Sequence, residues 1–180
     1  MGKIHPVKPV KLISGMIFNQ ITILDKIKLT LEKKFGEIDW ESEIFPFDKT
    51  DYYAEEMGRN LKRKFLSFKR LIPPDKIAEI KIFTNGLEKR FSQGGRRQIN
   101  LDPGYITDSK LVLATTKNYY HRIYLKKGIY GEVTLYFRDR SFHHFEYTYP
   151  DYRTQEYINF FNQVRKIYLE QIREISHKSD

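Results

Sequence analysis

Polar side chains recur at regular positions among strand-forming residues between Arg96 and Glu146. Basic groups with aromatic neighbours are suited to contacts with phosphates and to stacking on planar rings. The formal net charge of +9 and the pI near 9.5 also favour anionic partners. We therefore expect one wall of an anion-binding site in this stretch, built from Arg97, Asn100, Tyr105, Lys110, Lys117, Arg122 and Glu132.

Two residues of the same stretch have side chains suited to catalysis. His121 stands at the expected start of a strand, where it can act as a general base or contact a phosphate. Asp102 opens the run Asp-Pro-Gly-Tyr, which predicts a tight turn at residues 102–105 with Gly104 at positive φ. From the end of a strand, the Asp102 carboxylate can bind a metal or orient a hydroxyl. Each residue also has a simpler interpretation, as an incidental surface histidine and as an aspartate that only starts a turn.

The loop after Phe47 is rich in carboxylates, with Asp48, Asp51, Glu55 and Glu56 close together. Mg²⁺ and Ca²⁺ take oxygen ligands. Asp48 and Asp51 are therefore the candidate metal ligands, and Mg²⁺ is the candidate cofactor. The spacing does not match an EF-hand, and a solvated acidic loop in which an aspartate caps a helical turn is the alternative.

The run from Tyr130 to Arg138 alternates like a strand with one buried face. It places Tyr130, Glu132, Thr134, Tyr136 and Arg138 on a polar face, and it turns Val133, Leu135 and Phe137 to the core. A neighbouring strand adds Arg122, Tyr124 and Lys126 to the polar side. This surface suits a ligand, and an ordinary solvated sheet face explains it equally well.

The sequence lacks the short motifs of common nucleotide-binding and hydrolase folds. It contains no GxxxxGK[ST] phosphate loop, no GxGxxG, no HExxH and no GxSxG. The absence of cysteine excludes disulfides, thiolate metal sites and cysteine nucleophiles. No signal-peptide pattern is present and no stretch approaches the ~20 apolar residues of a membrane helix, so we expect a cytoplasmic protein.

Hydrophobic periodicity and turn signals predict the elements that position these residues. Strands are expected at residues 10–18, 40–47, 64–71, 97–101, 111–116, 122–126, 130–138 and 142–147, with hairpin turns at 126–128 and 139–141. Helices are expected from Thr22 to Gly36, from Pro73 to Gly95, and from Thr154 onward. The last helix carries a core-facing stripe of Tyr157, Phe161, Val164, Tyr168, Ile172 and Ile175.

The first elements follow the order strand, helix, strand, strand, helix, strand, which is that of a split βαβ, ferredoxin-like half. Further strands joined by hairpins follow, and no linker or repeat divides the chain. We therefore expect a single α+β domain over residues 1–180, with an ordered core at about 8–175 and loose termini. Its sheet should be mainly antiparallel, with helices packed mostly on one face.

Several short segments recur in one known family: Lys8–Leu12, Phe45–Asp48, Thr50–Tyr53, Lys64–Phe68, Glu79–Lys81, Asn100–Tyr105, Lys110–Ala114, His121–Tyr124 and Thr148–Tyr152. Through them the chain resembles a bacterial and archaeal family known only as domain of unknown function number 4416, from Lys8 to about Gln171. Members are sometimes labelled GTP-binding, so the resemblance implies that nucleotides should be tested as ligands. It implies no mechanism.

Three functions are compatible with these features. In the first, the protein binds a phosphorylated small molecule, a nucleotide or RNA in a basic, aromatic cleft, with or without turnover and with possible assistance from a metal. In the second, it is a non-catalytic RNA- or ribosome-associated protein whose binding weakens steeply with salt. In the third, it is a protein-interaction module whose exposed tyrosines and phenylalanines form the contact surface.

Overall fold

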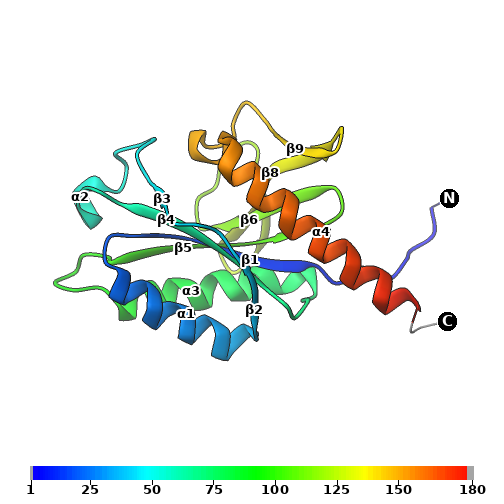
Figure 1. Ribbon diagram of the computed structural model, residues 1–180, viewed down its shortest axis with the longest axis horizontal. Helices are drawn as coiled ribbons and strands as arrows, with labels where there is room; N and C mark the ends of the chain where they lie inside the picture. Colours follow the sequence, from blue (N-terminus) through cyan, green and yellow to red (C-terminus); the bar gives the residue numbers. More distant parts are fainter. Residues whose placement is uncertain (1, 178–180) are drawn as a thin grey trace.

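Strand β1 (Lys11–Phe18) runs through the middle of the sheet, and all eight of its residues are buried. Its nearly continuous apolar run predicts a strand covered on both faces, and the structure confirms this. The computed structural model describes residues 2–177, in which nine strands form one sheet and four segments are α-helical (Figure 1). Met1 and residues 178–180, which the expected domain includes, lie outside the described residues.

The remaining elements confirm a mixed α+β class. The strands are β2 (Ile38–Glu41), β3 (Phe45–Pro46), β4 (Lys62–Phe68), β5 (Ile99–Ile106), β6 (Lys110–Thr115), β7 (Ile123–Lys126), β8 (Ile129–Arg138) and β9 (Ser141–His144). The helices are α1 (Ile21–Phe35), α2 (Ala54–Met57), α3 (Ile77–Arg90) and α4 (Gln155–His177). Two short 3-10 helices, η1 (Pro74–Lys76) and η2 (Pro150–Arg153), precede α3 and α4.

The prediction of a mainly antiparallel sheet is confirmed, since every strand pairing is antiparallel. The strand order is β2-β4-β1-β5-β6-β8-β7, with β3 beside β4 and β9 beside β8. In the first half, α1 connects β1 to β2 with β4 between them, and α3 connects β4 to β5 with β1 between them. These are two interleaved split βαβ units. The assignment of this half to the ferredoxin-like folds stays a prediction.

Helices cover both faces of the sheet (Figure 1). On one face, α1 and α3 share a buried apolar cluster with β1, in which Met16 packs with Ile27. On the opposite face lies α4, whose Phe161 belongs to a second cluster with Ile13. Met16 and Ile13 face opposite ways because successive side chains along a strand alternate between its two faces.

The expected turn at residues 102–105 is wrong, because this segment lies inside β5 and pairs with β1 along its whole length. Gly104 is absent from the glycines at positive φ. Its lack of a side chain leaves room for β6, because a Cβ at position 104 would lie 2.4 Å from the backbone oxygen of Val112. The glycine therefore permits a close approach between two strands rather than a turn.

The sheet opens between β5 and β6 beyond Gly104. The ladder between them covers only Gly104 to Ile106 of β5, although β5 begins at Ile99 and β6 continues to Thr115. Pro103 stands where the pairing stops, and it has no N–H to offer a neighbouring strand.

Side chains of α3 replace the missing strand neighbour of Leu101. The Leu101 N–H donates to Oε1 of Glu88 at 2.6 Å, and the Leu101 carbonyl accepts from Nζ of Lys81 at 2.7 Å. In an antiparallel ladder, both backbone groups of one residue point to the same side. These contacts therefore satisfy the groups that β6 would otherwise pair with.

A β-bulge in β8 changes the face that Glu132 occupies. Leu111 of β6 pairs with Leu135, whereas the next residue, Val112, pairs with Val133, so Thr134 is the extra residue. Glu132 and Leu135 consequently share a face, and both are buried. The prediction that Glu132 and Leu135 lie on opposite faces of this strand is therefore wrong.

The two predicted hairpin turns are confirmed by residues at positive φ, namely Lys127 (51°), Gly128 (76°), Asp139 (48°) and Arg140 (66°). The helix expected from Thr22 begins one residue earlier, at Ile21, and Thr22 does not cap it, since α1 has no side-chain cap. The stripe of α4 is buried as far as Tyr168 and exposed at Ile175.

Within residues 2–177, no helix combines the length and the apolar character needed to cross a membrane.

Candidate functional site

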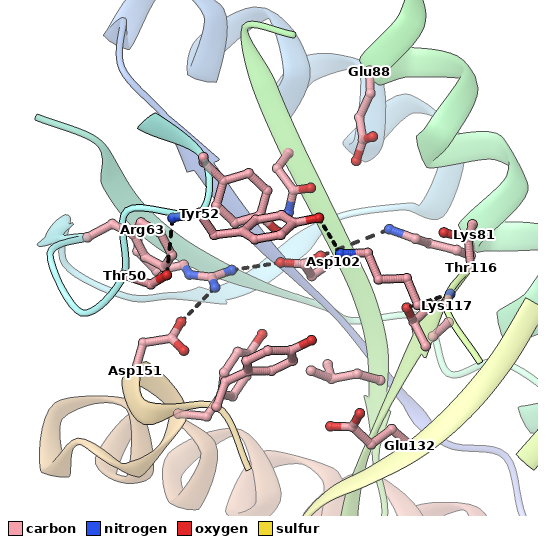
Figure 2. Close-up of a pocket in the computed structure, with 18 of the residues that line it drawn as sticks. Thr50, Tyr52, Arg63, Lys81, Glu88, Asp102, Thr116, Lys117, Glu132 and Asp151 are labelled. Carbon is pink, nitrogen blue, oxygen red and sulfur yellow. Dashed lines mark hydrogen bonds and ion pairs between the residues drawn. The ribbon is translucent and has the colours of Figure 1, made fainter. Parts of the chain in front are cut away.

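A cleft of about 520 Å³ lies where β5 and β6 diverge (Figure 2). Its inner walls come from β5, β6 and α3, and the loops after β3, after β6 and before η2 surround its mouth. The lining includes six cationic side chains (Lys49, Arg63, Lys81, Arg97, Lys117 and Arg122) and four carboxylates (Glu88, Asp102, Glu132 and Asp151). Five aromatic residues join them: Phe47, Tyr52, Tyr53, Tyr149 and Tyr152. The cleft is therefore charged, slightly basic and aromatic.

Arg63 of β4 is the buried centre of the charges in the cleft. Its Nη1 donates to Oδ2 of Asp102 at 3.0 Å, and its Nη2 donates to Oδ2 of Asp151 at 2.7 Å. The Arg63 side chain is only 3% exposed. A buried guanidinium is tolerated when it is both paired and hydrogen-bonded. Arg63 thereby ties β4 to β5 and to η2 at the base of the cleft.

Aromatic rings surround the Arg63 guanidinium. The ring centroids of Phe47, Phe65 and Tyr152 lie 5.1, 5.3 and 5.3 Å from its Cζ, within the range of cation–π contacts. Gly15 on β1 provides the space for this arrangement, because a Cβ there would lie 3.0 Å from Nη1 of Arg63 and 3.2 Å from the Tyr152 hydroxyl oxygen. A glycine inside a strand is explained here by close side-chain approach.

Burial and charge act in opposite directions on this cluster. Burial alone would raise the pKa of Asp102, but Arg63 and Lys81 outweigh it and hold that pKa below its ordinary value. Burial would likewise lower the pKa of Arg63, but Tyr152, Asp151 and Asp102 raise it well above the usual range. Burial raises the pKa of the Tyr152 phenol. At neutral pH the cluster therefore contains charged Arg63 and Asp102 beside a neutral phenol.

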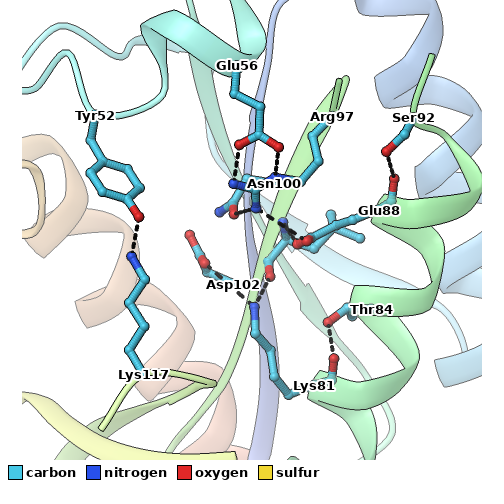
Figure 3. A network of polar contacts seen from close by, with 11 residues as sticks. Tyr52, Glu56, Lys81, Thr84, Glu88, Ser92, Arg97, Asn100, Asp102 and Lys117 are labelled. Carbon is cyan, nitrogen blue, oxygen red and sulfur yellow. Dashed lines mark hydrogen bonds and ion pairs between the residues drawn. The ribbon is translucent and has the colours of Figure 1, made fainter. Parts of the chain in front are cut away.

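A second network joins α3 to β5 and α2 (Figure 3). Arg97 donates through Nε and Nη2 to both carboxylate oxygens of Glu56, at 2.6 and 2.5 Å, and through Nη1 to Oδ1 of Asn100 at 3.1 Å. The hydrogen bonds from Arg97 hold the pKa of Glu56 below its ordinary value, whereas burial raises the pKa of Glu88. The network fixes Asn100 against the wall of the cleft.

Glu132 is the centre of a third cluster, on the β8 side. Its Oε2 accepts from Nε of Arg122 at 2.8 Å and lies 2.9 Å from Nε2 of His121. The His121 ring stacks on Tyr147, with centroids 4.1 Å apart and an interplanar angle of 10°. Arg122 also donates through Nη2 to the Tyr149 hydroxyl at 3.1 Å. His121 thus contacts Glu132 and does not itself line the cleft.

Lys117 stands at the mouth of the cleft. Its Nζ donates to the Tyr52 hydroxyl and lies 4.2 Å from the centroid of that ring. Each of the other five cations has a carboxylate oxygen within 4.0 Å. In the part of the chain that the structure describes, Lys117 has none, so its charge is available to an anion.

The structure brings six of the predicted site residues together in the cleft: Arg97, Asn100, Asp102, Lys117, Arg122 and Glu132. Tyr105 and Lys110 lie apart from them, beside a smaller hollow of about 280 Å³ that α4 also lines. They are separated because the hairpin between β5 and β6 lies at the paired end of these strands, whereas the cleft lies at the open end.

The two candidate metal ligands lie in the exposed loop between β3 and α2, outside the cleft lining. Asp48 pairs with its neighbour Lys49 at 3.3 Å, and the Asp51 carbonyl accepts the N–H of Ala54 at 2.9 Å. Across residues 2–177, no group of three or more His, Asp or Glu side chains is arranged to hold a metal. A metal role for Asp48 and Asp51 stays a prediction, as does a role for Mg²⁺.

Sequence reasoning missed five charged residues of the cleft, namely Lys49, Arg63, Lys81, Glu88 and Asp151. The sequence contained a signal for three of them. Lys81 and Glu88 are seven residues apart, so they share one side of α3, and both are buried beside its apolar stripe. Arg63 also carried a signal, since it stands two residues before Phe65 and therefore shares its face of a buried strand. Asp151 had none beyond its place in an aromatic loop.

These features define a single-domain α+β protein with a charged cleft at an opening in its antiparallel sheet. The chain belongs to the family described as Domain of unknown function (DUF4416), which matches it over residues 8–168. All residues that line the cleft fall within that range. No significant match is found among curated proteins or among solved structures.

Proposed function

We propose that this protein is a cytoplasmic binder of a small phosphorylated ligand, with nucleotides among the candidates, and that the ligand occupies the cleft between β5 and β6. The observation that carries this proposal is Lys117, which stands at the mouth without a carboxylate partner among the described residues. A lysine ammonium is a common point-charge contact for phosphate. The net charge of +9 adds long-range attraction for such a ligand.

The pairing of the inner cations favours a phosphate at the mouth rather than at the base. Arg63, Arg97 and Arg122 are each neutralised by neighbouring carboxylates. A phosphate placed among them would have to compete with those carboxylates in a poorly solvated space. At the mouth it would meet Lys117, and Thr50 of the loop after β3 also lines the cleft.

The size and the walls of the cleft suit a molecule of nucleotide dimensions. Its volume of about 520 Å³ falls within the range of roughly 300–1,000 Å³ that is common for small-molecule sites. Tyr52 and Tyr149 line the cleft while remaining 61% and 47% exposed. Their rings offer surfaces on which a planar group can stack. We assign no reaction to this cleft.

A thermal-shift screen tests the proposal. The full chain is heated with inorganic pyrophosphate, sugar phosphates, and nucleoside mono- and diphosphates, each with and without Mg²⁺. A ligand at a hundred times its Kd stabilises the folded state by roughly 2.7 kcal/mol, which corresponds to several degrees in Tm. We expect such a shift with a phosphorylated compound and not with its dephosphorylated counterpart. Equal shifts with both, or no shift with any phosphorylated compound, would contradict the proposal.

The screen also tests the predicted metal site. A shift that requires Mg²⁺ and is lost in the double variant Asp48→Asn, Asp51→Asn would support that site. A Mg²⁺-dependent shift that survives in the double variant would assign the ion to the ligand phosphates instead.

The edge strand β7 favours a second candidate function, the binding of single-stranded RNA. Tyr119, Tyr120 and Tyr124 are exposed at this end of the sheet, and Lys126 and Lys127 follow them in sequence. Exposed rings beside Lys127 suit base stacking and a phosphate contact, whereas Lys126 is paired with Glu79 at 2.9 Å. We expect a short RNA to bind with an affinity that falls steeply with salt and that weakens in Tyr120→Ala with Tyr124→Ala. Salt-insensitive binding, or binding that this pair leaves unchanged, would exclude β7 as the site.

A further inference from the structure

Asp102 has the most accessible carboxylate side chain of the cleft. Its side chain is 24% exposed, against 8% for Glu88, 3% for Glu132 and 7% for Asp151. Asp102 lies deep in the protein, and in Figure 2 it stands at the centre of the residues that line the cleft. Its exposed part therefore faces the space that a ligand would occupy.

One oxygen of Asp102 is available as an acceptor. Oδ2 accepts from Arg63, whereas the nearest cation to Oδ1 is Nζ of Lys81 at 4.0 Å, which is beyond hydrogen-bond distance. Glu88 and Glu132 each use both oxygens within the protein, Glu88 with the Leu101 N–H and Arg97, and Glu132 with Arg122, His121 and Thr134. Asp151, like Asp102, binds Arg63 through one oxygen, but its side chain is only 7% exposed and so offers little surface to a ligand.

Asn100 provides a donor next to this acceptor. It stands two residues before Asp102, so both side chains emerge from the same face of β5. Its Oδ1 accepts from Arg97, and its Nδ2 lies close enough to Asp102 to help lower the pKa of that carboxyl, but it makes no hydrogen bond of normal geometry with any described residue. The residue is only 4% exposed, and it lines the cleft. A buried amide donor without a partner is costly unless something else uses it.

A hydroxyl group matches this pair of residues. Asp102 is ionised at neutral pH, so it repels a phosphate and binds a donor. The neighbouring cations Arg63 and Lys81 would repel a ligand ammonium. A hydroxyl both donates and accepts, so it can donate to Asp102 and accept from Asn100 at the same time.

We propose that the ligand is a phosphorylated sugar, free or as the ribose of a nucleotide, with its phosphate at Lys117 and a sugar hydroxyl between Asp102 and Asn100. This inference rests on the proposed function, which supplies the phosphate contact. Asp102 is then the residue that distinguishes sugar phosphates from other phosphates. A site built to hydrogen-bond a hydroxyl strongly rejects an analogue without it, because its own polar groups are left unpaired.

Isothermal titration of the full chain compares phosphates with and without hydroxyl groups. The probes are ribose 5-phosphate, glucose 6-phosphate, uridine 5′-monophosphate, the 2′,3′-dideoxy form of that nucleotide, and methyl phosphate. We expect the best hydroxyl-bearing probe to bind at least about tenfold more tightly than methyl phosphate. Tight binding of a sugar phosphate alone identifies a free sugar, whereas a nucleotide that weakens in its dideoxy form identifies ribose. If methyl phosphate binds as tightly as every other probe, this inference fails and the proposed function stands. If no probe binds, both fail.

Two matched variants separate ligand contact from support of Arg63. Asp102→Asn and Asp151→Asn each remove one negative charge and one charged partner of Arg63. We expect Asp102→Asn to abolish the advantage of the sugar phosphate over methyl phosphate. Asp151→Asn should change both affinities by the same factor. If the two variants reduce that advantage equally, Asp102 acts only through Arg63 and the inference is wrong. Should Asp102→Asn fail to fold, Asn100→Ala removes the neighbouring donor and should lower the same ratio about tenfold.

Discussion

The Glu88 carboxylate accepts the backbone N–H of Leu101 at 2.6 Å, at the place where a continuous sheet would set a neighbouring strand. Lys81, from the same helix, donates through Nζ to the Leu101 carbonyl oxygen at 2.7 Å. The opening between β5 and β6 is therefore stabilised by two charged side chains of α3. The cleft exists because these side chains satisfy backbone groups that would otherwise require β6.

Removal of the Glu88 acceptor should destabilise the fold. Glu88→Ala leaves the Leu101 N–H without a partner, which should lower the free energy of unfolding by about 1–3 kcal/mol. Glu88→Gln keeps an acceptor oxygen in place and should cost less. Urea denaturation of the two variants measures the difference. Equal losses would mean that the hydrogen bond to Leu101 contributes little.

Glu88 should also make stability depend on pH. Burial raises its pKa above the ordinary value of 4.5, so in the folded state Glu88 retains its proton to higher pH than in the unfolded state. This contribution to stability is present below pH 4.5 and is lost as pH rises through the higher folded pKa. The Glu88→Gln variant should lack the decline in that window. A wild type and variant with parallel stability–pH curves would refute the prediction.

Two glycine-to-alanine substitutions should have opposite effects. In Gly15→Ala the new Cβ would lie 3.0 Å from Nη1 of Arg63, so packing around the guanidinium must shift at a cost of about 1–3 kcal/mol. Gly86 lies in α3 with nothing within 4 Å of the same position, and Gly86→Ala should stabilise the protein by about 0.4–1 kcal/mol. Thermal denaturation gives both values. A neutral Gly15→Ala would show that Arg63 can move away from β1 at little cost.

The Tyr152 hydroxyl is buried without a hydrogen-bond partner among the described residues, so its removal should not harm stability. We expect Tyr152→Phe to leave Tm unchanged or to raise it, because no hydrogen bond is lost and a desolvated polar group is removed. The matched control is Tyr147→Phe, which loses the hydrogen bond from Tyr147 to the Val133 carbonyl at 3.0 Å. That change should lower the free energy of unfolding by about 0.5–1.5 kcal/mol. Destabilisation by Tyr152→Phe would reveal a polar contact of its hydroxyl.

The helices and most strands could be predicted from the sequence, because their patterns are local. Residues such as Phe161 on α4 and Ile13 on β1 repeat at the period of their element, and both are buried in the structure. The Asp-Pro-Gly run shows where local reasoning stops. These residue types favour turns in most settings, yet long-range pairing with β1 holds residues 102–104 in an extended strand.

The candidate site was predictable only in part, because its charges are paired across distant segments. Asp102 and Lys117 could be picked out by residue type alone. Arg63 is 39 positions from Asp102 and 88 from Asp151, and only the folded chain shows that one guanidinium binds both carboxylates. The bulge at Thr134, which turns Glu132 toward the cleft side, likewise depends on strand register rather than on composition.

One titration tests directly whether Lys117 is the phosphate contact. The phosphorylated compound that gives the largest thermal shift is titrated into the wild type, Lys117→Met and Lys110→Met. Lys110 is an exposed lysine that lies outside the cleft, so its variant controls for the loss of one positive charge. We predict that Lys117→Met weakens binding about tenfold or more, equivalent to ~1.4 kcal/mol, and that Lys110→Met changes it less than about twofold. Equal affinities for the two variants would contradict a phosphate site at the mouth of the cleft.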